Sequence, residues 1–98
     1  LPPFGRLASI IVSATSQDDA IPHARALARC APRIDGVLIL GPAEAPIALV
    51  RGRHRYRLLI KAPRGFDLSD YLREMIAAAP KPVRSTRAVV DVDPQSFL

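Results

Sequence analysis

The chain has 98 residues, which is enough for one domain but too few for two hydrophobic cores. Its composition, 49% hydrophobic and 23% charged, excludes an intrinsically disordered chain and predicts a folded single domain over residues 1–98. Fourteen Lys and Arg against nine Asp and Glu give a net charge of +5, which favours an anionic partner such as a nucleic acid backbone or an acidic peptide.

Targeting and redox features point to an intracellular location. Cys30 is the only cysteine, so the chain can form neither an internal disulfide nor a thiolate metal cluster. No apolar run approaches the roughly 20 residues that cross a bilayer, and no signal-peptide pattern is present. We therefore expect a cytoplasmic protein with no membrane partner. The start, Leu-Pro-Pro-Phe, is typical of a chain arriving from an upstream domain, so we expect a fragment with a linker at residues 1–6.

The first two predicted elements are a strand and a helix. Residues 7–14 alternate with a period of two and are apolar enough to form a central strand. One of its faces carries Ala8, Ile10, Val12 and Ala14, and the other carries Leu7, Ser9, Ile11 and Ser13. Polar residues 15–19 supply candidate helix caps, and apolar residues then recur at helical spacing until Pro32 ends the helix.

Three extended segments follow. The short apolar run at residues 37–40 lies between Gly36 and the Gly41-Pro42 breaker, which favours a strand over a helix. Segments 47–51 and 54–62 predict a hairpin that turns at Gly52. We expect the Pro- and Ala-rich stretch between them, residues 42–46, to form a surface loop.

The last two predicted elements are a helix and a strand. Asp67 is a candidate N-cap, and apolar residues between Leu68 and Ala79 fall on one helical stripe before Pro80 stops the helix. Residues 87–92 predict a final strand. The order β-α-β-β-α-β predicts an α+β, ferredoxin-like split βαβ fold, in which two helices pack on one face of an antiparallel sheet. In its usual strand order, the first strand lies between the last strand and the Arg-rich one.

The Arg-rich strand is the strongest candidate binding site. In a strand, alternate side chains point to opposite faces of the sheet. His54, Tyr56, Leu58 and Ile60 therefore face the core, and the basic residues between them face the other way. Closely spaced guanidinium groups can bind phosphates or carboxylates bidentately. The alternative is that these charges bind no ligand and only keep an exposed sheet face hydrated. The candidate DNA- or anion-binding residues are Arg51, Arg53, Arg55, Arg57 and Lys61.

Enzyme chemistry is disfavoured. Acylphosphatase, a basic enzyme of this topology, needs an asparagine that the chain lacks, and the five glycines form no phosphate-binding loop. His23 and His54 lack the spacing of metal ligands, and no His is placed in sequence to activate Cys30. Asp91 and Asp93 fit arginine pairing or capping better than acid-base catalysis. We predict no catalytic residue, no metal and no cofactor within this chain.

Base stacking is also disfavoured. RNA-binding domains of this topology stack bases on aromatic residues of the open sheet face. The chain has two Tyr and three Phe, and none falls clearly on the exposed faces of the central strands. Sequence-specific readout of single strands is therefore not expected.

Four segments of the chain resemble one known family in order and spacing. They are LPPFGRLA at residues 1–8, LGPA at 40–43, RGRHRYRLLIKAP at 51–63 and DVDP at 91–94. Together they resemble the C-terminal domain of the PriA replication-restart DNA helicases (primosomal protein N-prime), over essentially the whole chain.

The resemblance implies a longer parent protein that recognises abandoned replication forks, unwinds DNA in the 3′ to 5′ direction with ATP and helps to reload the replicative helicase. The family's ATP, Mg and zinc sites would lie upstream, so this domain would be non-catalytic. The implied partners are branched or single-stranded DNA, the acidic tail of single-stranded DNA-binding protein, and the helicase core of the same chain. The alternative is a structural brace that packs on that core and binds no ligand of its own.

The resemblance also implies a pocket for the acidic tail. The family's basic tail-binding residue lies two positions after the proline that ends the Arg-rich strand, and an amide-bearing residue follows one helical turn later. Here those positions are Gly65 and Ser69, so either Arg64 replaces the basic residue with a shift of one position or the pocket is weaker or rearranged. The candidate tail pocket comprises Lys61, Arg64, Gly65, Phe66 and Ser69.

Overall fold

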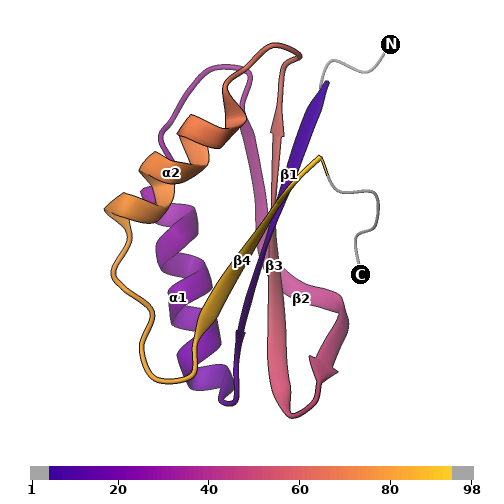
Figure 1. Cartoon of the computed structure of the whole chain (residues 1–98), viewed down its shortest axis with the longest axis vertical. Helices are drawn as coiled ribbons and strands as arrows, with labels where there is room; N and C mark the ends of the chain where they lie inside the picture. Colours follow the sequence, from indigo (N-terminus) through magenta and orange to yellow (C-terminus); the bar gives the residue numbers. More distant parts are fainter. Residues whose placement is uncertain (1–4, 94–98) are drawn as a thin grey trace.

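The computed structural model describes residues 5–93, so Phe4, Phe97 and most of the Leu-Pro-Pro-Phe-Gly start lie outside the described residues. Its elements in chain order are β1 (Arg6–Ala14), α1 (Gln17–Cys30), β2 (Leu38–Val50), β3 (Arg53–Ala62), α2 (Leu68–Ala78) and β4 (Arg87–Val92). The sheet is antiparallel with the order β2-β3-β1-β4, and both helices lie on one of its faces (Figure 1). The predicted α+β, ferredoxin-like fold is therefore confirmed.

Strand β1 occupies the centre of the sheet, as the sequence predicts. Val12 pairs with Tyr56 of β3 on one side and with Ala88 of β4 on the other. The side chains of β1 that face the helices are fully buried; they belong to Ala8, Ile10, Val12 and Ala14. The alternation of apolar residues thus positions the whole core.

Each helix begins at a side-chain cap. The Ser16 hydroxyl accepts a hydrogen bond from the Asp18 N–H at 3.1 Å, and the Asp67 carboxylate accepts one from the Asp70 N–H at 3.0 Å. These bonds satisfy N–H groups for which a first helical turn has no backbone acceptor. The predicted cap at Asp67 is confirmed.

Buried side chains join the helices to each other and to the sheet. Leu27 of α1 and Met75 of α2 belong to one core cluster with the helix-facing residues of β1 and β3. The Tyr71 hydroxyl of α2 donates to the Pro32 carbonyl at 2.6 Å, which ties α2 to the segment that follows α1.

Strand β2 corrects one expectation. The sequence predicts a surface loop over residues 42–46, but these residues lie within the single 13-residue strand β2. Pro42 and Pro46 lack an N–H, and the register shifts between residues 40 and 43 and again between residues 44 and 49. An edge strand tolerates such prolines, and the buried Ala45 anchors the segment. Between residues 44 and 49, β2 bends away from β3 on the side of the sheet opposite the helices, and it pairs with β3 again at Leu49 and Val50 (Figure 1).

The expected linker at residues 1–6 stays a prediction. Residues 1–4 lie outside the described residues, while the Gly5 N–H donates to the Ala62 carbonyl at 3.1 Å and Arg6 begins β1. The described part of that segment is thus continuous with the sheet.

Candidate nucleic-acid interface

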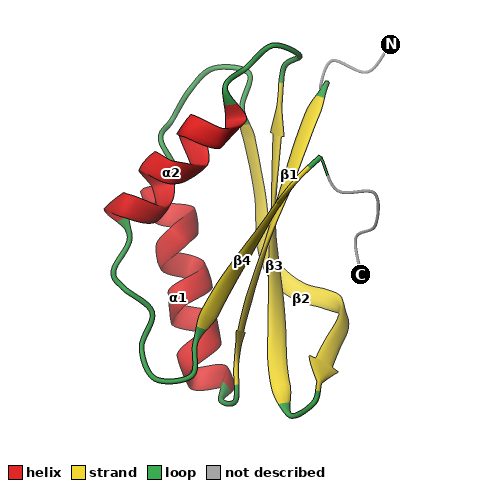
Figure 2. Ribbon diagram, in the orientation of Figure 1, coloured by secondary structure: helices red, strands yellow, loops and turns green. Residues whose placement is uncertain are grey.

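The open face of the sheet is the face opposite the two helices (Figure 2). On β3, Tyr56, Leu58 and Ile60 are buried beneath the helices, and the half-buried residues that alternate with them face the other way. The open face therefore carries Arg53, Arg55, Arg57 and Lys61.

Four arginines line a hollow of about 410 Å³ at the hairpin end of this face. Pairing places Ser13 of β1 between Arg55 of β3 and Arg87 of β4. Arg51 comes from the hairpin turn and Arg53 from the first position of β3. The hollow is lined by Ser13, Val50, Arg51, Arg53, Arg55 and Arg87. No carboxylate is among these residues, so the hollow concentrates positive potential and suits a phosphate group.

Arg87 is the member of this group that the sequence reasoning missed. It is exposed and occupies the first position of β4. Its position could have been predicted from the sequence, because the predicted strand order puts the last strand beside β1 and the alternation of that strand puts Ala88 toward the core. Arg87 must then project from the same face as the arginines of β3.

Arg53 differs from the other arginines because its guanidinium is fixed by the fold. Its Nε donates to the Ser13 hydroxyl at 3.2 Å, and its Nη2 donates to the carbonyls of Ser13 and Ser85 at 2.9 and 2.6 Å. The Ser85 hydroxyl in turn accepts from the Thr15 N–H at 3.0 Å. Arg53 thus joins β3 to β1 and to the loop before β4, which makes it a structural member of the hollow.

The remaining cations of β3 lie in different surroundings. Arg55 donates from Nη1 to the Ile47 carbonyl of the bent part of β2 at 2.7 Å. Arg57 lies opposite Ile11 of β1. Lys61 lies four residues further along β3, away from the hollow. The structure therefore groups Arg51, Arg53 and Arg55 with Arg87 and separates Lys61 from them.

The rest of the open face is largely apolar. It carries Leu7, Ile11, Leu40, Leu59 and Val89. Among the described residues no aromatic side chain lies on this face, because Tyr56 faces the helices and the other aromatics belong to α2 or precede it. An unstacked base would find no aromatic partner on this part of the sheet.

The candidate tail-pocket residues occupy the β3–α2 connection and its surroundings. Arg64 and Gly65 are exposed in a turn, where Gly65 has a φ of +85°. The Phe66 ring packs edge-on against Tyr71 with their centroids 5.7 Å apart. Ser69 is exposed in the first turn of α2 and contributes to a hollow of about 240 Å³ between α2 and β4. Lys61 lies on the open face of the sheet, whereas α2 covers the other face.

A cation that the sequence reasoning did not assign lies beside this turn. Arg6 donates from Nη1 to the Phe66 carbonyl at 3.1 Å and forms an ion pair with Asp93 at 3.0 Å. The Leu7 N–H and the Arg6 guanidinium together hold the pKa of Asp93 below its ordinary value. Asp93 therefore pairs with arginine, as the sequence predicts for this carboxylate.

Residues 5–93 contain no helix that is long and apolar enough to cross a membrane. In the same residues, no three His, Cys, Asp or Glu side chains gather in a group that could hold a metal ion.

Comparison with known proteins identifies the family. The family described as primosomal protein N C-terminal domain matches residues 1–95. The chain belongs to this family. The basic open face is therefore a feature of a primosomal protein N C-terminal domain, which fits the resemblance found in the sequence.

The curated relatives are replication restart proteins. The chain is 37% identical over 97 residues to the replication restart protein PriA of Rickettsia felis, with 99% of this chain and 15% of the relative covered. It is also 37% identical over 97 residues to the probable replication restart protein PriA of Deinococcus radiodurans, with 97% and 10% covered. The relative from Haemophilus influenzae is 35% identical over 65 residues, 66% of this chain. The chain thus spans 15% or less of the length of these relatives.

Proposed function

We propose that this domain binds the phosphate backbone of branched or single-stranded DNA through the open face of its sheet, as a non-catalytic part of a replication-restart helicase. The hollow lined by four arginines carries this proposal, because convergent guanidinium groups engage phosphate oxygens by charge-assisted hydrogen bonds. The names of the relatives support a role in replication restart. The ATP-driven unwinding that the family resemblance implies would belong to the upstream parts of the parent protein.

The cations of the hollow have different roles in this proposal. Arg51 and Arg87 are exposed and form no hydrogen bond or ion pair with residues 5–93, so both are available to phosphate. Arg55 and Arg57 add positive charge along β3, and Lys61 extends the row beyond the hollow. Arg53 has a structural role, because its Nε and Nη2 donate to Ser13 and Ser85.

The test is fluorescence anisotropy with a labelled fork DNA. The double variant Arg51→Ala/Arg87→Ala removes the two exposed cations of the hollow and should weaken binding by about tenfold or more, since each lost phosphate contact costs on the order of 1 kcal/mol. The matched control, Arg25→Ala/Arg29→Ala, removes two exposed cations from α1 on the other side of the sheet and should change binding by less than about twofold. Equal effects of the two double variants would contradict the proposal.

The same domain is also proposed to dock the acidic tail of single-stranded DNA-binding protein at the β3–α2 turn. Exposed Arg64 supplies a cation there, and Phe66 and the hollow beside Ser69 supply apolar contacts. In a chemical-shift titration with a tail peptide, we expect perturbations at residues 64–69 that Arg64→Ala removes. Unchanged perturbations in that variant would exclude Arg64 from the pocket.

The alternative function is a structural brace for the helicase core of the same polypeptide. The apolar part of the open face favours it, because Val89 is 59% exposed beside the arginines. A brace predicts that the isolated chain binds neither fork DNA nor the tail peptide at low salt. Binding of either ligand at its proposed residues would exclude a purely structural role.

A further inference from the structure

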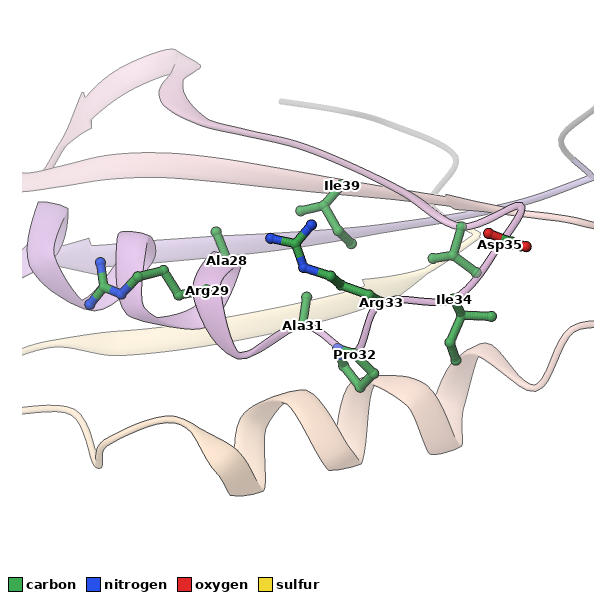
Figure 3. Close-up of a pocket in the computed structure, with 9 residues that line it drawn as sticks. Ala28, Arg29, Ala31, Pro32, Arg33, Ile34, Asp35 and Ile39 are labelled. Atoms are coloured by element: carbon green, nitrogen blue, oxygen red, sulfur yellow. The ribbon is translucent and has the colours of Figure 1, made fainter.

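A second hollow, of about 510 Å³, lies on the helix side of the sheet between the end of α1 and the start of β2. Ala28 and Ala31 of α1 line it together with Val37 and Ile39. Figure 3 shows Arg33 extending toward Ile39, whereas the Arg29 guanidinium runs along α1, away from Ile34 and Asp35. The lining thus combines apolar residues with two arginines, and it shares no residue with the arginine hollow of the open face.

This hollow borders an unpaired strand edge. Within residues 5–93, β3 is the only strand that pairs with β2, so the other edge of β2 presents N–H and C=O groups to the outside. Prolines and register shifts protect the later part of that edge, which is a common way to prevent strand addition. Residues 38–40, at the start of β2, have no such protection. They read Leu-Ile-Leu, and Leu38 and Leu40 are 43% and 39% exposed.

The two arginines of the hollow are not engaged by the described part of the chain. Arg29 and Arg33 are exposed and form no hydrogen bond or ion pair with residues 5–93. The negative end of the α1 dipole accounts for a cation at Arg29, in the last turn. Arg33 lies beyond the end of the helix and gains less from that dipole. The lining contains one carboxylate, Asp35, so the hollow keeps a net positive charge.

We infer that this edge and hollow bind an extended acidic segment of a partner protein, which adds to β2 as a fifth strand of the sheet. Main-chain hydrogen bonds to residues 38–40 supply affinity for any extended segment, whereas the Val37 N–H is already donated to the Ile34 carbonyl at 3.1 Å. Alternate apolar side chains of the added strand enter the hollow beside Ile39 or contact Leu38 and Leu40. Carboxylates that flank the apolar part reach Arg29 and Arg33, which selects an acidic segment over a basic one.

The experiment is an NMR chemical-shift titration of the isotope-labelled chain with three capped peptides. The probe is Glu-Glu-Val-Ile-Val-Glu-Glu, the charge-reversed control is Lys-Lys-Val-Ile-Val-Lys-Lys, and the apolar-deleted control is Glu-Glu-Ser-Gly-Ser-Glu-Glu. We expect the probe to shift residues 29–40 and to bind at least tenfold more tightly than either control. Equal binding of the probe and the charge-reversed peptide would overturn the inference.

Charge-swapped variants locate the site. The double variant Arg29→Glu/Arg33→Glu changes only exposed side chains and should reverse the preference, so that the lysine-flanked peptide binds more tightly. The matched control Arg25→Glu/Lys81→Glu removes as much positive charge outside the hollow and should keep the preference for the probe. Reversal in both variants would show a non-specific effect of net charge and would overturn the inference.

Backbone methylation separates strand addition from binding by side chains alone. In an added strand, alternate N–H groups of the peptide face the partner strand. Methylation of one alternate set of the peptide amides should therefore abolish binding, whereas methylation of the other set should leave it within about threefold. Equal tolerance of both sets would exclude strand addition. The chain could instead pair with a second copy of itself at this edge. In that case it would diffuse more slowly than a monomer without any peptide, and Leu38→Lys would restore the diffusion of a monomer. That result would contradict the inference.

Discussion

The domain has two cationic hollows, and they differ in what surrounds the charges. In the hollow on the open face, four arginines converge around Ser13, and Val50 is the one apolar residue of the lining. In the hollow between α1 and β2, two arginines stand over apolar residues beside an unpaired strand edge. A phosphate backbone needs concentrated charge, whereas a peptide needs apolar contact and main-chain partners as well. Similar side chains can therefore serve two classes of ligand, according to the elements that present them.

The largest expected effect concerns the one arginine of the open face that the fold itself uses. Arg53→Met keeps the apolar stem but removes three hydrogen bonds to Ser13 and Ser85. We expect the free energy of unfolding in urea to fall by about 2–3 kcal/mol, since hydrogen bonds from charged donors are worth more than neutral ones. Arg51→Met, in the exposed turn, should cost less than about 0.5 kcal/mol. Similar losses in both variants would mean that Arg53 has no special structural role.

A smaller loss of stability is expected at Gly41, which separates the unprotected edge of β2 from the bent part near Arg55. Gly41 has a φ of +98°, and a Cβ there would lie 2.6 Å from the Arg57 carbonyl oxygen. Gly41→Ala should therefore lower the free energy of unfolding by about 2 kcal/mol through backbone strain and this clash.

Gly52 provides the matched control for that substitution. It also has a positive φ, +75°, but an added Cβ there meets nothing within 4 Å. Gly52→Ala should cost about 1 kcal/mol, from the backbone conformation alone. If circular dichroism melts show equal losses for the two variants, the close approach of β2 to Arg57 is not a constraint.

The next prediction sharpens the boundary of the DNA-binding face. Arg87 lines the hollow, whereas Lys61 lies further along β3 opposite Leu7. We expect Arg87→Ala to weaken fork DNA binding by about fivefold, a loss on the order of 1 kcal/mol, and Lys61→Ala to weaken it by less than twofold. A larger effect at Lys61 in the same anisotropy assay would move the interface toward the apolar end of the sheet.

The smallest expected effect is a pH dependence of the free energy of unfolding, which arises from His23 on the helix side of the sheet. Burial of His23 lowers the pKa of its imidazole, so the unfolded chain binds a proton more readily than the folded chain. Stability should consequently fall as the pH drops below the ordinary histidine value of about 6.5. Urea unfolding at pH 5 and pH 7.5 measures this slope, and His23→Leu should flatten it. An unchanged slope in that variant would assign the pH dependence to other groups.

The sequence predicts most of this fold because its local signals agree with one another. Alternation separated the two faces of β1 and defined the buried face of β3, and Asp67 marked the start of α2. The continuity of β2 was not predictable, because prolines indicate a loop unless the strand is known to lie at an edge. The predicted strand order was correct, and it was sufficient to bring Arg87 beside the arginines of β3.

The role of Arg53 could not be predicted from the sequence. Period-two geometry places it in the same row as Arg55 and Arg57, and that placement is correct. Its commitment to Ser13 and Ser85 depends on contacts with residues 40 and 32 positions away, which local periodicity does not encode. A row of like residues therefore shows which face carries charge, but it does not show which of those charges the fold already uses.

The most direct test of the central claim is the salt dependence of fork DNA binding. If Arg51 and Arg87 contact phosphates, a plot of log affinity against log salt concentration should lose about 1.8 from the magnitude of its slope in the Arg51→Ala/Arg87→Ala variant, since each duplex phosphate contact contributes about 0.9. The Arg25→Ala/Arg29→Ala control should keep the slope of the unmodified chain. An unchanged slope in the first variant, or an equal loss in the control, would contradict the assignment of the open face as the DNA-binding surface.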